Sequence, residues 1–101
     1  MESIKLLRCL SKYFPKSIKS PGDYVGHMYG KLPKEINNVL LCLDFDDFVL
    51  DYIVKHNLHP DLILSHHPFI YGTIKKVLKR SEIKRNLCEK LDKFGFCVYS
   101  M

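Results

Sequence analysis

The sequence predicts an α/β fold in which a helix is followed by a strand-helix-strand-helix-strand unit. Two short apolar runs, at residues 39–43 and 62–64, alternate with segments whose apolar residues recur at helical spacing. Strands that alternate with helices in this way pair in parallel and are joined by right-handed crossovers. Parallel strands deliver their carboxyl ends to one edge of the sheet, so we expect functional groups at that edge.

The first half of the chain begins with a predicted amphipathic helix over residues 3–14, which Pro15 ends. Residues 16–33 contain several glycines and prolines among polar residues, and this composition indicates a long irregular connection. The run at residues 39–43 is continuously apolar and ends at Asp44. It predicts a strand buried on both faces, at the centre of a sheet.

A second amphipathic helix is expected directly after this strand. Asp46 or Asp47 can cap its first turn, and the helix should end near Asn57. The apolar positions fall on one stripe, which is expected to face the core and consists of Phe48, Val49, Tyr52 and Ile53.

The rest of the chain continues the alternation of strands and helices. Residues 62–64 predict the second strand, and helices are expected over residues 74–79 and 81–93. Gly95 breaks the longer helix, and residues 96–99 predict the third strand. The buried stripe of the longer helix is expected to consist of Ile83, Leu87 and Leu91.

Composition limits the classes of protein that need to be considered. The 101 residues suit one small domain or one piece of a larger domain, and the net charge of +5 either attracts an anionic ligand or keeps the chain soluble. Cysteines without C-x-x-C spacing indicate free, reduced thiols, and no secretory signal or membrane-length segment is present, so a cytoplasmic protein without a membrane partner is expected. The four cysteines are Cys9, Cys42, Cys88 and Cys97.

The main basic cluster lies on the two C-terminal helices and consists of Lys75, Lys76, Lys79, Arg80, Lys84 and Arg85. It lacks interleaved aromatic residues and any nucleic-acid-binding motif, so a solvated helix face is favoured over a nucleic-acid contact. The cluster is compatible with an anionic small-molecule substrate.

Ser65-His66-His67-Pro68, at the end of the second strand, is the strongest candidate for chemistry. Neutral imidazoles bind zinc, iron, manganese or nickel, and a strand end leaves them oriented and reachable. Consecutive strand side chains point to opposite sides, and Pro68 keeps His67 extended, so His66 and His67 are expected to hold different ions. Two-metal hydrolytic sites place their ions about 3.5–4 Å apart. The alternative is that one histidine packs and the other hydrogen-bonds a loop.

Other polar residues allow different interpretations. Asp44 and Asp46 after a buried strand resemble the Asp-x-Asp element of haloacid-dehalogenase-like phosphatases, although Phe48 departs from that family's pattern. His56 and His59 lie close in sequence to an aspartate, but a helix end and a turn account for them better than a metal cluster does. His27, a single loop histidine, is expected to be solvated.

Four segments carry a resemblance that covers nearly the whole chain. Asp23-Tyr24-Val25-Gly26 with Gly30, residues 38–44, residues 61–70 and residues 95–100 are similar to segments of one family. This is the dinuclear-metal-centre family often labelled type 2 GTP cyclohydrolase I homologues. The chain departs from its pattern at three positions, with Gly22, His27 and Asp46 where the family usually has Trp, Leu and often Thr.

The resemblance implies a homohexamer with two divalent ions per subunit, where His66 serves one ion and His67 the other. In the family a His-Thr-x-x-Asp element follows the last matching strand, and a later His and Glu supply further ligands. Residues 1–101 are therefore expected to be the N-terminal portion of a single dinuclear-metal α/β protein, incomplete at the C-terminus and part of a larger interleaved domain. Alone, they should bind metal weakly at most.

The activity that the resemblance implies is metal-dependent hydrolysis of a nucleotide or of another phosphate-containing or cyclic amide compound. The GTP cyclohydrolase label comes from the family name alone. Two alternatives stay open. One is a metal-dependent oligomeric binding or regulatory protein without turnover, and the other is the phosphatase that would use Asp44 and Asp46.

Overall fold

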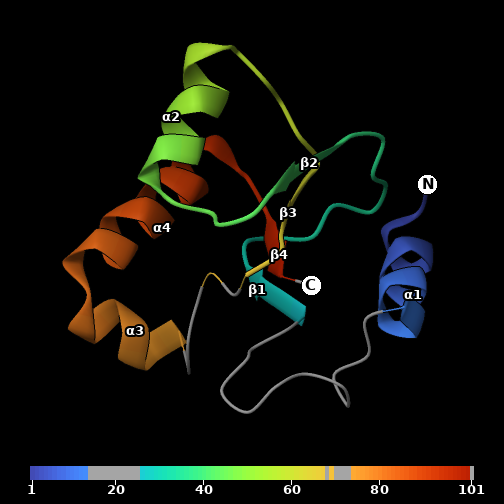
Figure 1. Cartoon of the computed structure of the whole chain (residues 1–101), viewed down its shortest axis with the longest axis horizontal. Helices are drawn as coiled ribbons and strands as arrows, with labels where there is room; N and C mark the ends of the chain where they lie inside the picture. Colours follow the sequence, from blue (N-terminus) through green and yellow to red (C-terminus); the bar gives the residue numbers. More distant parts are fainter. Residues whose placement is uncertain (14–25, 68, 70–73, 101) are drawn as a thin grey trace.

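The fold is a four-stranded sheet with helices on both faces (Figure 1). The computed structural model describes residues 1–13, 26–67, 69 and 74–100. In chain order the elements are α1 (Ser3–Tyr13), β1 (Gly26–Tyr29), β2 (Val39–Cys42), α2 (Asp47–Lys55), β3 (Leu62–Ser65), α3 (Ile74–Arg80), α4 (Glu82–Phe94) and β4 (Val98–Ser100). The predicted α/β class and the predicted alternation of elements are confirmed.

The strands lie in the order β1-β4-β3-β2. β2, β3 and β4 are parallel, as expected, and β2 pairs with β3 from Val39 opposite Leu62 to Cys42 opposite Ser65. β1 is antiparallel to β4 and was not expected, because residues 16–33 read as an irregular connection. The start of that connection, within residues 14–25, lies outside the described residues, as does Pro68.

Two apolar cores cover the two faces of the sheet. On one face, Ile63 and Val98 of the central strands pack with α2, α3 and α4. On the other face, Leu64 and Tyr99 pack against partly buried leucines of α1. All four residues of β3 are buried, because this strand is covered on both faces. Its carboxyl end is therefore held rigidly.

The sequence placed β2 wrongly at the centre of the sheet. β2 lies at an edge, and Leu41 is 69% exposed. The physical reason is that helices cover only one face of β2. Residues 40 and 42 face α2 and are partly buried. On the other face, α1 packs over β3 and β4 and leaves Val39 and Leu41 exposed.

Two helical stripes also differ from expectation. In α2, Leu50 and Ile53 face the core while Phe48 and Tyr52 are exposed, so the buried face is rotated from the predicted one. In α4, the buried residues are Leu87, Cys88 and Leu91, and Ile83 is exposed. A stripe read from apolar residues alone cannot identify which flank the sheet covers.

Helix ends follow the sequence signals closely. The Asp46 side chain accepts a hydrogen bond from Val49 N at 3.0 Å and caps α2, as the N-cap interpretation predicted. Ser81 caps α4 in the same way, through Lys84 N. Gly95 ends α4 in the left-handed conformation at φ 73°, which glycine adopts without strain.

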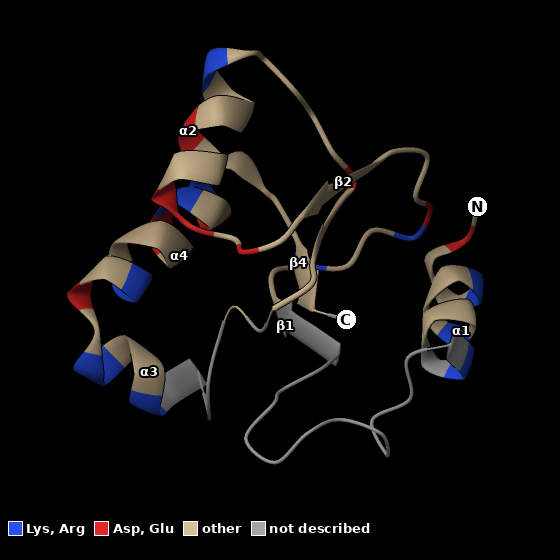
Figure 2. Ribbon diagram, viewed as in Figure 1, with Lys and Arg blue, Asp and Glu red and all other residues tan. Residues whose placement is uncertain are grey.

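Many of the Lys, Arg, Asp and Glu residues lie on the helices (Figure 2). Four members of the predicted basic cluster, Lys76, Lys79, Arg80 and Arg85, are exposed. This agrees with the solvated helix face that was expected for them. No helix within residues 1–13, 26–67 and 74–100 is both long enough and apolar enough to cross a membrane.

We expect the free energy of unfolding to decrease as the pH rises from 9 to 11. Burial raises the pKa of the Cys88 and Cys97 thiols from 9.0 to about 11, so the folded chain keeps protons that the unfolded chain releases. The stabilisation is complete below pH 9 and is lost as the pH rises through the folded pKa. Urea unfolding at several pH values measures it. The Cys88→Ala/Cys97→Ala variant should show a smaller decrease, and an equal decrease would contradict the prediction.

Candidate metal centre

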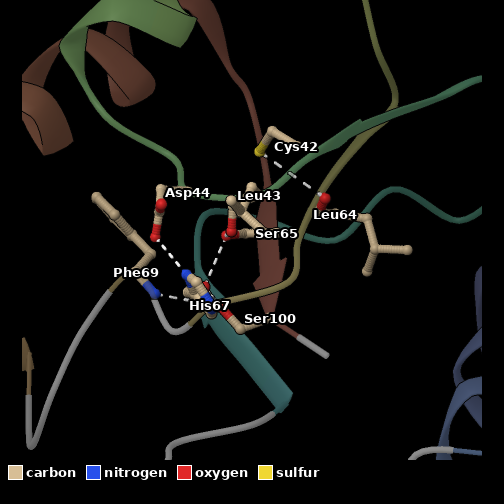
Figure 3. A network of polar contacts seen from close by, with 8 residues as sticks. All are labelled: Cys42, Leu43, Asp44, Leu64, Ser65, His67, Phe69 and Ser100. Carbon is tan, nitrogen blue, oxygen red and sulfur yellow. Dashed lines mark hydrogen bonds and ion pairs between the residues drawn. The ribbon is translucent and has the colours of Figure 1, made fainter.

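The candidate site lies where the parallel strands β2 and β3 end (Figure 3). Cys42 pairs with Ser65, so two residues further along each strand Asp44 comes opposite His67. The two side chains meet there, with 2.7 Å between His67 Nδ1 and Asp44 Oδ1. The sequence identified both residues but assigned them to different hypotheses, and strand register brings them together.

Buried hydroxyl groups fix the backbone of this segment. Ser65 is fully buried, and its Oγ donates a hydrogen bond to His67 O at 2.6 Å. Ser100, at the end of β4, is also buried, and its Oγ lies 3.4 Å from His67 O and accepts a hydrogen bond from Phe69 N. The turn that carries the histidines is thus anchored to the ends of two central strands.

The two imidazole rings lie on the same side of the chain, contrary to the expected divergence. Their centroids are 5.1 Å apart and the ring planes are inclined by 44°. The reason is that β3 ends at Ser65, so the alternation of strand side chains does not extend to His66 and His67. Both backbone N–H groups donate to the end of β2, to Cys42 O and Leu43 O, whereas consecutive N–H groups of a regular strand point to opposite sides.

The contact with Asp44 determines which nitrogen of His67 can bind a metal. An ionised carboxylate only accepts hydrogen bonds, so a neutral His67 ring in this contact is assigned its proton on Nδ1 and its lone pair on Nε2. The same arrangement of carboxylate, imidazole and metal orients histidine ligands in many metal sites. The side chains of His67 and Asp44 are 48% and 60% exposed, so a ligand can reach them from solvent.

The donor set fits a divalent ion but does not complete its coordination. Imidazole nitrogen and carboxylate oxygen suit zinc, iron, manganese or nickel. Within the described part of the chain, no group of three or more histidine, cysteine, aspartate or glutamate side chains is arranged to hold a metal ion. A closed coordination shell around an ion at these residues would require further ligands.

Two other carboxylates near the site have structural partners. Asp46 caps α2, and Asp47, in the first turn of that helix, lies 3.8 Å from Lys90 Nζ. Neither carboxylate points to a partner among the histidines. The Asp44 and Asp46 pair of the phosphatase alternative is thus divided between an imidazole contact and a helix cap.

Two of the remaining candidate residues, His56 and Asp61, make contacts within the fold. His56 stacks on Tyr52, with ring centroids 4.0 Å apart, and its Nδ1 lies 2.9 Å from Tyr52 O. The Asp61 carboxylate accepts hydrogen bonds from the backbone N–H groups of residues 37 and 38. His56 and Asp61 therefore have partners within the fold. His27 belongs to β1 and not to a loop.

A sequence model of the family described as Duf34/NIF3 (NGG1p interacting factor 3) matches residues 1–101. The chain belongs to this family. It is 31% identical over 96 residues to a Bacillus subtilis protein named "GTP cyclohydrolase 1 type 2 homolog", and the match covers 95% of this chain and 25% of that protein. A Listeria innocua protein of the same name is 36% identical over 91 residues, covering 90% of this chain and 24% of that protein.

The fold of the family is also found among solved structures. The crystal structure of a Staphylococcus aureus hypothetical protein matches with a TM-score of 0.77 at 24% identity, and the match covers 100% of this chain and 32% of that protein. The family model and the curated relatives confirm the family resemblance seen in the sequence. The chain spans about a quarter of the length of the two curated relatives described above.

We expect Ser65→Ala to destabilise the fold more than Asp44→Ala does. Removing the Ser65 hydroxyl deprives the turn of its shortest hydrogen bond, which costs about 1–3 kcal/mol. Asp44 makes an exposed contact with His67, and exposed contacts of a charged group contribute less than about 1 kcal/mol. Urea unfolding of the two variants measures the difference. A larger loss for Asp44→Ala would show that the contact with His67, and not the hydroxyl, holds the turn.

Proposed function

We propose that the chain contributes two imidazole ligands and one orienting carboxylate to a divalent-metal centre of a hydrolase. The observation that carries the proposal is the 2.7 Å contact between His67 Nδ1 and Asp44 Oδ1, which leaves Nε2 of His67 available at an exposed strand end. Asp44 would hold the ring in the orientation and tautomer that a ligand needs.

The spacing of the histidines supports a centre with two ions per subunit. The ring centroids lie 5.1 Å apart, which is compatible with His66 serving one ion and His67 another at the separation of about 3.5–4 Å found in two-metal sites. Zinc, iron, manganese and nickel match the donors. When bound, such ions supply Lewis-acid activation of water and of the substrate's electrophilic group.

The rest of the proposal concerns a protein longer than this chain. The relatives are about four times as long, so we place the missing ligands and the substrate contacts in the remainder of a single interleaved α/β domain. We further propose a cytoplasmic homohexamer, as the family resemblance implies. The substrate would be a nucleotide or a related phosphate-containing or cyclic amide compound, in keeping with the name of the relatives.

Metal binding is tested on the chain itself. Titration with Zn²⁺, followed by NMR of the imidazole nitrogens, should shift the signals of His66 and His67 before those of other histidines. Affinity should be weak, because the described ligands leave an ion undercoordinated. His66→Ala and His67→Ala should each lower the affinity by roughly tenfold or more, as the loss of one ligand does.

The matched control is His56→Ala. His56 also lies at the end of an element, as the C-cap of α2, but its Nδ1 contacts the backbone carbonyl of Tyr52. This change should leave zinc affinity within about twofold of the wild type. Equal zinc affinity in the wild type and the His66→Ala/His67→Ala double variant would contradict the proposed metal centre.

Turnover is tested with the longer polypeptide that the relatives predict. Loaded with metal, it should hydrolyse at least one member of a panel of nucleotides and phosphoesters, and His66→Ala or His67→Ala should abolish that activity. Activity that survives both changes would contradict the hydrolase proposal. Stoichiometric metal binding without any turnover would favour a binding or regulatory protein instead.

A further inference from the structure

Lys84 lies beside the candidate metal centre and has no role in the proposals above. It sits in the first turn of α4, and its side chain is partly buried. Lys84 Nζ lies 4.5 Å from the centroid of the Phe69 ring, two residues after His67. The Phe69 ring in turn packs edge-on against the ring of Phe45, the neighbour of Asp44, with 5.2 Å between the ring centroids. A cation–π contact and an edge-to-face ring contact therefore connect Lys84 to the segments that follow both strands.

The ammonium group is short of hydrogen-bond acceptors in this position. Three carboxylates are close enough to favour its charged form electrostatically, yet burial is the larger effect and lowers the pKa of Lys84. In the described part of the chain each of these carboxylates is engaged elsewhere, Asp44 with His67, Asp46 with Val49 N and Asp47 with Lys90. No ion pair of Lys84 is present there.

We propose that Lys84 binds a compact oxyanion, the phosphate or carboxylate group of a substrate whose reacting atoms lie at the histidines. This inference rests on the proposed metal centre and specifies its substrate class. An ammonium group offers three donors, and the face of Phe69 hydrogen-bonds to none of them. Hydrogen bonds from a partly desolvated ammonium to an oxyanion are charge-assisted and stronger than neutral ones.

The three carboxylates near Lys84 should make its affinity for an anion depend on whether metal is bound. Asp44, Asp46 and Asp47 repel an approaching oxyanion, and they lie close enough to act on Lys84. Divalent ions at His66 and His67 would offset this negative charge. Anion affinity should therefore be higher with metal than without it, which separates this site from the exposed lysines of α3.

Lys93 provides a matched control on the same helix. Its Nζ also lies over an aromatic ring, 5.7 Å from the centroid of Phe94, but about 13 Å further along α4. Lys84→Gln and Lys93→Gln remove the same charge, and Lys84→Arg keeps the charge. The three variants separate a local site from a general effect of net charge.

The experiment is calorimetric titration of the zinc-loaded chain with methyl phosphate and, separately, with acetate. Lys84→Gln should weaken binding of at least one anion by roughly tenfold, because a hydrogen bond to a charged group contributes at least one such factor. Lys93→Gln should change the affinity by less than about twofold, and Lys84→Arg should retain most of it. Preference for methyl phosphate indicates a phosphate-bearing substrate, and preference for acetate a carboxylate.

An affinity that Lys84→Gln leaves unchanged, or that Lys93→Gln reduces equally, would overturn the inference. Thermal unfolding of each variant establishes that it is folded, and Lys84→Met, which keeps the apolar stem over Phe69, replaces Lys84→Gln if that variant is unstable. Failure of the proposed metal centre can be distinguished from failure of the Lys84 inference, because zinc would then not bind at His66 and His67 in the wild type. Zinc binding at the histidines, together with an anion affinity that does not depend on Lys84, refutes this inference alone.

Discussion

The parallel pairing of β2 with β3, in which Cys42 lies opposite Ser65, is the constraint on which the site depends. It brings two segments that are more than twenty residues apart in sequence to one edge, where Asp44 meets His67. A shift of one residue would place Asp44 opposite Pro68 or His66. Since every residue of β3 is buried, such a shift would also move apolar side chains out of both cores.

Beyond the ends of the regular strands, the hydroxyl groups of Ser65 and Ser100 hold the backbone in place of strand pairing. Ser65 and Ser100 lie on adjacent parallel strands, and both are directed to the carbonyl of His67. Secondary structure alone would leave this carbonyl without a strand partner. Hydrogen bonding thereby continues two residues beyond β3, and it holds the backbone that carries the imidazoles.

The sequence predicted where helices and strands lie better than it predicted which of their side chains are buried. The positions of α1, α4 and the central strands follow from apolar spacing, and Asp46 and Gly95 mark helix ends by their local chemistry. Exposure of Leu41, Phe48 and Ile83 was missed, because a periodic pattern reports which residues are apolar and not which neighbours cover them. The contact of Asp44 with His67 was missed for a related reason, since it depends on strand register, which no local motif encodes.

The uncovered side of β2 has a consequence for handling the protein. A sheet edge carries backbone groups that can hydrogen-bond to another strand. The exposed side chains of Val39 and Leu41 are apolar, so they do not oppose such pairing as charged side chains would. Proteins usually protect edges with charges, prolines or bulges, and Val39–Cys42 contains no charge and no proline. We therefore expect edge-to-edge association of the 101-residue chain at high concentration, and Leu41→Lys should reduce it.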